Sequence, residues 1–141
     1  MIRRLALVLL LSACGREGPA VRVGDAYAFE PVLGTVGAVY LTVTNSGSTP
    51  DTVAGVEVSG ALVAMIHEQV TVGDRVEMRH VGPLPVAAGS TVVLAPGGYH
   101  VMIEGMEQPP VAGDTLDVTL RFARAGSVTV RAPVLPYGTE R

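Results

Sequence analysis

The chain has 141 residues, with ten basic residues against thirteen acidic ones and a formal charge of −3. This length predicts one domain, and the mild acidity without a basic stripe argues against nucleic acid as a partner. With two Phe, four Tyr and no Trp, the core must be aliphatic.

The N-terminal segment has the features of a secretory signal. A positive segment over residues 1–4 precedes the apolar run Leu5–Leu11, which is too short to span a bilayer. Residues 11–14 read Leu-Ser-Ala-Cys, which resembles a bacterial lipobox, in which the Cys becomes the lipidated first residue. An ordinary signal peptide with an incidental Cys is the alternative. Because Cys14 is the only Cys of the chain, we favour the lipoprotein.

This reading sets the predicted domain boundaries. We expect a signal peptide over residues 1–13, a lipidated Cys14 with a polar tether over residues 14–20, and a β domain over residues 21–134. Residues 135–141 form a short tail that is expected to fray. The protein is then extracytoplasmic, in the periplasm or at the cell surface, and the lipid on Cys14 anchors it to a membrane.

Apolar and polar residues alternate with a period of two through most of the β domain, as in half-buried strands. No segment beyond the signal has a long helical period. Seven to nine short strands separated by turns predict an all-β fold, an antiparallel sandwich or barrel of Greek-key type. The strands expected are 39–44, 51–58, 62–67, 76–80, 91–94, 99–103, 116–122 and 128–131.

Two His and two Met residues are the candidate metal ligands. They are His67, Met78, His100 and Met102. Two imidazoles and two thioethers suit a soft monovalent ion such as Cu(I). On their strands, His67 faces away from Ile66, and His100 and Met102 point to one face. Three neighbouring strands can therefore direct four ligands to one place near the solvent.

The absence of thiols favours the same chemistry. Thiolates bind Cu(I) more tightly than thioethers, but thiols tend to oxidise outside the cytoplasm, and no Cys follows Cys14. Thioethers need no deprotonation, so only the His ligands couple the site to pH. We expect Cu(I) affinity to fall as the pH drops below the ordinary His pKa of about 6.5.

Each of these residues alone would be unremarkable, because a lone Met usually fills the core and a lone His usually lies at the surface. Met65, His80 and Met106 are nearby and are interpreted as packing, surface or supporting residues. His80 shares strand parity with Met78, so it is the first of the three to reconsider.

The spacing His-x10-Met-x21-His-x-Met resembles the motif of the periplasmic copper chaperones called PCu(A)C, and all four positions match. Residues 40–45 (Tyr-Leu-Thr-Val-Thr-Asn), 96–102 (Pro-Gly-Gly-Tyr-His-Val-Met) and 113–116 (Gly-Asp-Thr-Leu) also resemble that family. The resemblance covers residues 21–134. It implies a cupredoxin-like β fold, a Cu(I) site of these two His and two Met, and delivery of copper to the CuA centre of cytochrome c oxidase. The implied partner is subunit II of the oxidase or an assembly factor.

Two departures from the family pattern matter. Glu68 stands where some relatives have Met directly after the first His, which changes the local charge. The tail has neither His nor Met, whereas some relatives hold a second copper there. We therefore predict one Cu(I) per chain and a monomer.

Other classes of protein fit less well. A blue-copper protein needs a Cys ligand, a zinc enzyme needs ligands other than thioethers, and no Gly-x-Ser-x-Gly nucleophile occurs. The chain is therefore predicted to be no enzyme but a chaperone that transfers copper by ligand exchange. Two alternatives stay open: a copper storage or resistance protein, and a metal-free lipoprotein sandwich used in adhesion or assembly.

Overall fold

The computed structural model of the protein describes residues 20–32 and 34–140. Within these ranges no helix is long and apolar enough to cross a membrane. The predicted signal peptide and Cys14 lie outside the described residues. Ten strands form in chain order: β1 (Val21–Phe29), β2 (Gly37–Asn45), β3 (Asp51–Val58), β4 (Val63–Val72), β5 (Arg75–His80), β6 (Leu84–Val86), β7 (Ser90–Leu94), β8 (Tyr99–Glu104), β9 (Thr115–Phe122) and β10 (Gly126–Leu135).

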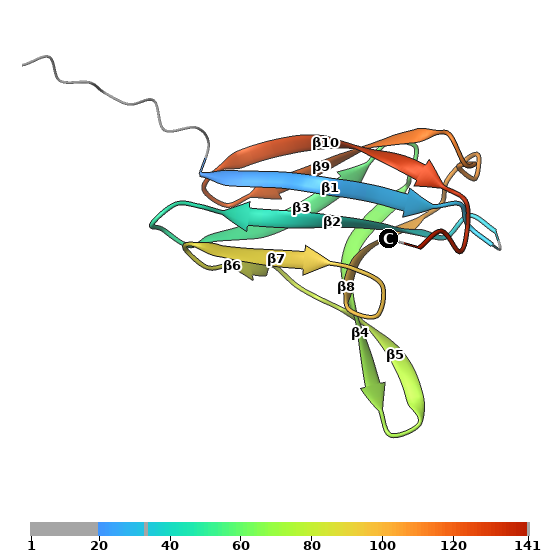
Figure 1. Cartoon of the computed structure of the whole chain (residues 1–141), viewed down its shortest axis with the longest axis horizontal. Coiled ribbons are helices and arrows are strands. Elements are labelled where there is room, and N and C mark those ends of the chain that lie inside the picture. Colours follow the sequence, from blue (N-terminus) through green and yellow to red (C-terminus); the bar gives the residue numbers. More distant parts are fainter. Residues whose placement is uncertain (1–19, 33, 141) are drawn as a thin grey trace, which may run out of the picture.

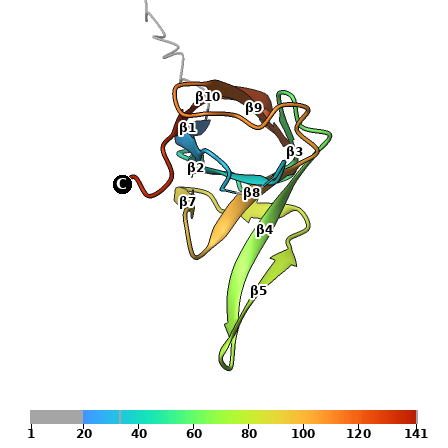
Figure 2. The same ribbon diagram turned by 90° about the vertical axis from the view of Figure 1, so that its right-hand side faces the viewer.

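The strands form one sheet in the order β5-β4-β8-β2-β1-β10-β9-β3-β6, and β7 pairs with the remaining length of β2. The sheet curls around the core, and the hairpin of β4 and β5 projects from the body (Figures 1 and 2). The two ends of β2 differ in their partners. Gly37–Val39 pairs with β8, whereas Asn45 pairs with Val21 at the start of β1. The start of β1 and the projecting hairpin therefore lie toward opposite ends of β2.

The prediction of an all-β fold is confirmed, and three details need correction. The structure has ten strands rather than seven to nine, because β1 and β6 were not predicted. The register of β1 shifts between Gly24 and Tyr27, and Asp25 has a positive φ of 51°. This bulge interrupts the period of two. The sheet is not wholly antiparallel, since β1 and β10 pair in parallel, and β10 continues to Leu135, into the predicted tail.

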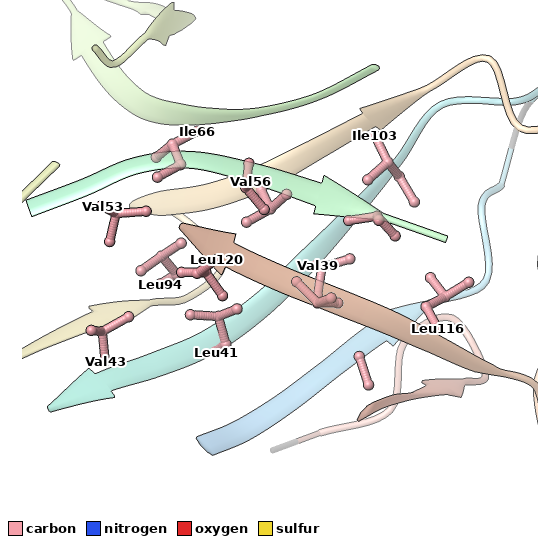
Figure 3. Packing of buried hydrophobic residues seen from close by; sticks show 14 of the residues in the cluster. Val39, Leu41, Val43, Val53, Val56, Ile66, Leu94, Ile103, Leu116 and Leu120 are labelled. Carbon is pink, nitrogen blue, oxygen red and sulfur yellow. The ribbon is translucent and has the colours of Figure 1, made fainter. Parts of the chain in front are cut away.

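The core is aliphatic, as the composition predicts. Alternate residues of β2, namely Val39, Leu41 and Val43, are at most 1% exposed. They pack with side chains from β3, β4, β7, β8 and β9 (Figure 3). Each buried Leu or Val of this kind contributes roughly 1.5–3 kcal/mol relative to an exposed one. Met106 is also buried in this cluster, which makes it a packing residue.

Candidate metal centre

Strands β5, β4 and β8 lie side by side and bring the chain's three His residues into one row. In the antiparallel ladders, His67 of β4 is opposite His80 of β5 on one side and opposite His100 of β8 on the other. Because side chains alternate along a strand, Ile66 and Val101 enter the core. The His residues therefore share the opposite face of the three strands.

His100 is held in a defined orientation by the turn that precedes it. Its Nδ1–H donates to the Gly98 carbonyl at 3.1 Å, so Nε2 is the ring nitrogen that could bind a metal. The same carbonyl accepts the backbone N–H of Gln69 at 3.1 Å, so the turn also joins β4 to β8. Gly97 supplies the positive φ of 85° that this turn requires. The sequence Pro-Gly-Gly-Tyr-His thus fixes the orientation of this imidazole on the outer face.

His67 is buried, with 9% of its surface exposed, as is His100 with 7%, whereas His80 is exposed. The Nδ1 of His67 is buried and has no hydrogen-bond partner, which costs roughly 1–3 kcal/mol. Burial lowers its pKa below the ordinary value of 6.5, and the neighbouring His100 and His80 lower it further against the opposing effect of Glu104. The imidazole is therefore neutral near pH 7. An unpaired, neutral nitrogen between two other imidazoles is a candidate metal ligand.

The two predicted thioethers lie on different sides of His67. Met102 follows His100 on β8 and is opposite Met65 of β4, so it adjoins the pair of imidazoles. Met78 is opposite Gln69 at the outer strand and is 54% exposed. His67, His100 and Met102 are thus brought together directly, while Met78 stands at the solvent side. No three His, Cys, Asp or Glu of residues 20–32 and 34–140 are gathered closely enough to hold a metal.

The rings of His67 and His100 are well placed to share an ion. Their centroids are 6.0 Å apart, with an interplanar angle of 74°. Two rings that bind one ion through metal–nitrogen bonds of about 2 Å have centres roughly 5–6 Å apart. This pair, with the adjacent thioether of Met102, is the part of the predicted ligand set that the structure brings together.

His80 and Met65 were not predicted as ligands, although the structure places His80 opposite His67 and Met65 opposite Met102. A usable signal was present in Gly73-Asp74, a two-residue turn between alternating runs that is typical of a β-hairpin. Gly73 has a φ of 61°, and the hairpin register that follows sets His80 opposite His67. Glu68, by contrast, is opposite Arg79 and Tyr99 and so lies on the other face of β4 from His67.

The ten-stranded sheet has the cupredoxin-like β fold of PCuAC domains. Similar solved structures include copper-bound domains. The chain is similar to the copper-bound PCuAC domain of PmoF2 (25% identity, 83% of this chain and 93% of that one, TM-score 0.69). It is also similar to Cu(I)-bound DR1885 of Deinococcus radiodurans (27% identity, 92% and 87%, TM-score 0.68). The predicted fold class and the resemblance to the PCu(A)C family are confirmed.

Sequence comparison gives the particular family. The family described as "Putative lipoprotein LpqE-like" matches residues 21–134, the same span as the predicted β domain. The "Putative lipoprotein Lxx21020" of Leifsonia xyli subsp. xyli is 35% identical over 124 residues, which are 87% of this chain and 74% of that protein. The chain belongs to the LpqE-like lipoprotein family.

Proposed function

We propose that this protein is a copper chaperone that binds one Cu(I) ion on the outer face of β4, β5 and β8. The ligands in this proposal are His67, Met78, His100 and Met102. The observation that carries it is the buried Nδ1 of His67, which has no partner and lies beside the oriented ring of His100. The names of similar proteins, which include copper-bound and Cu(I)-bound PCuAC domains, support the choice of ion.

The donor set fits Cu(I) in charge and softness. Thioether sulfur suits a soft, closed-shell ion, and neutral imidazole is acceptable to it. His67 is neutral near pH 7 because burial lowers its pKa, so it can bind without first losing a proton. The exposed Met78 would complete the set from the solvent side.

Delivery would proceed by ligand exchange. An acceptor approaching β5 meets Met78 first, and a weak, neutral thioether is readily displaced by a thiolate or imidazole of the acceptor. The ion stays Cu(I) throughout, so no electron is needed. We propose subunit II of cytochrome c oxidase, or an assembly factor for it, as the acceptor. A deletion strain that assembles a normal copper-loaded oxidase in copper-limited medium would contradict this destination and favour storage or resistance.

The membership of a lipoprotein family supports anchoring through Cys14. In this proposal residues 1–13 are removed, residues 14–20 are the anchor and tether, and residues 21–134 are the copper-binding domain, followed by the tail 135–141. Val21 lies at the Asn45 end of β2, and β8 pairs with its Gly37 end. A monomer tethered outside the cytoplasm would thus present its copper site away from the anchor.

Replacing Met102 with Leu tests the site. This change keeps an apolar side chain of similar size and removes the sulfur, so Cu(I) affinity should fall by at least about tenfold, since even supporting residues of metal sites cost that much. Affinity is measured by anaerobic competition titration of the purified full chain in detergent. Both proteins carry Cys14→Ser, which removes the only thiol.

Met106→Leu is the matched control, because Met106 is a buried packing residue and its thioether has no part in the proposal. Its Cu(I) affinity should equal that of the parent. Equal affinities for the Met102 and Met106 variants would sink the proposed ligand set. Saturation at two tightly bound equivalents would contradict one copper per chain, and no Cu(I) binding at all would favour the metal-free assembly module.

Cu(I) affinity should be constant near neutral pH and should decline on acidification. The pKa of His67 is lowered below 6.5, by burial first and then by His100 and His80, so protons compete with copper for this ligand only below that value. There the affinity should fall by up to about tenfold per pH unit for each imidazole that must lose a proton. Competition titrations between pH 8 and pH 5 measure the slope. A flat profile down to pH 5 would count against imidazole ligands.

A further inference from the structure

His80 and Met65 flank the proposed Cu(I) site and have no role in it. Both lie on the same face of the sheet as His67, one on the outer strand β5 and one on β4 itself. We propose that His80, Met65 and His67 form a second position for the same Cu(I) ion, next to the first and reached from solvent. This inference rests on the proposed function and deepens it by giving the ion a route into or out of the site.

The geometry of the second imidazole pair matches that of the first. The rings of His67 and His80 have centroids 5.9 Å apart and an interplanar angle of 77°, against 6.0 Å and 74° for His67 and His100. Both distances lie in the range of roughly 5–6 Å expected for two rings that share one ion through bonds of about 2 Å. The distances therefore give no preference for one side of His67 over the other.

Met65 supplies the thioether of the second position. It is two residues before His67 on β4, and period two places the two side chains on one face. Met65 and His80 both line a cleft of about 180 Å³ between β3 and the β4–β5 side of the sheet. Both donors therefore border one solvent-accessible space. Met102, directly opposite Met65, adjoins both positions.

The two positions share His67, so they hold one ion between them rather than two. One position offers the imidazole of His100 with Met102 and Met78, and the other offers the exposed imidazole of His80 with Met65. An ion can exchange one imidazole for the other while His67 keeps its bond. The donors at both positions are imidazoles and thioethers, with no anionic group. Cu(I) can therefore move between the positions without a change in the charge or the oxidation state of the complex.

The test removes the first position and asks what binding is left. In the full chain with Cys14→Ser, the variant His100→Gln/Met102→Leu should still bind one Cu(I), more weakly than the parent. Adding His80→Gln to that variant should lower the remaining affinity by at least about tenfold. Adding Val76→Ala instead is the matched control, because Val76 is an exposed residue on the same strand and face without a donor atom, and it should change nothing.

A spectroscopic readout follows the same question in the intact site. Titrating Cu(I) into the Cys14→Ser parent should shift the ring nitrogen signals of His80 in a ¹⁵N spectrum, together with those of His67 and His100. Residual Cu(I) binding that is equal with and without His80→Gln, or a complete loss of binding when the first position is removed, overturns the second position. In both cases a parent that binds Cu(I) keeps the proposed function. A parent that binds no Cu(I) removes both.

Discussion

A His67→Leu variant is expected to lose Cu(I) affinity by at least about 100-fold, the largest effect of any single ligand, since even supporting residues cost 10–100-fold. His67 is the centre of the row: its ring stands 6.0 Å from that of His100 and 5.9 Å from that of His80. Every arrangement of donors proposed for this face includes it. Anaerobic competition titration in the Cys14→Ser background measures the loss.

The same substitution should leave the metal-free fold as stable as before, or more stable. Leu removes the buried Nδ1 that has no partner and with it a cost of roughly 1–3 kcal/mol. The lowered pKa of His67 means that the unfolded chain binds the proton more tightly. The parent should therefore lose stability as the pH falls below about 6.5, and the variant should lose less.

Denaturant unfolding of both metal-free proteins at pH 7.5 and pH 5.5 checks this point. Leu62→Ala serves as the control, since Leu62 is 83% exposed and should change neither stability nor its pH dependence. A His67→Leu protein that is strongly destabilised at pH 7.5 would show that the imidazole has a structural role in the apo fold. Unchanged copper affinity would contradict its role as a ligand.

Strand parity and turn residues were enough to predict much of this architecture. The alternation at Val39, Leu41 and Val43 predicts β2 because that strand buries one face only, and these three residues are buried. The same rule correctly places the side chain of His67 on the face of the sheet opposite that of Ile66. It also places the side chain of His100 opposite that of Val101. These predictions depend only on residues that are close together in the chain, so they can be made from the sequence alone.

The features that were not predicted depend on interruptions of the strand pattern or on pairing partners far along the chain. The bulge at Gly24–Tyr27 disguises β1, and β6 has only three residues, one of them Pro85, which is rare within strands. The parallel pairing of β1 with β10 joins segments about 100 residues apart, which no local pattern reports. His80 beside His67 is the instructive case, because the Gly73-Asp74 turn fixes that register and was not used to derive it.

Truncating a core side chain should lower stability and leave copper affinity unchanged, which is the reverse of the result expected for His67→Leu. Leu120 of β9 is fully buried and packs among the aliphatic side chains of the curled sheet (Figure 3). Leu120→Ala should lower the free energy of unfolding by about 3 to 4 kcal/mol, from lost burial and the cavity left behind.

The copper affinity of this variant should stay close to that of the parent, because β9 pairs with β3 and β10 and not with β4, β5 or β8. Thermal and denaturant unfolding measure the first effect, and Cu(I) titration at a temperature below the unfolding transition of the variant measures the second. Leu62→Ala again gives a matched loss of side chain at an exposed position. If Leu120→Ala lowered Cu(I) affinity as much as His67→Leu, the metal site would depend on the whole core. If Leu120→Ala lowers stability and leaves Cu(I) affinity unchanged, the metal site depends on the three strands that carry its ligands and not on the whole core.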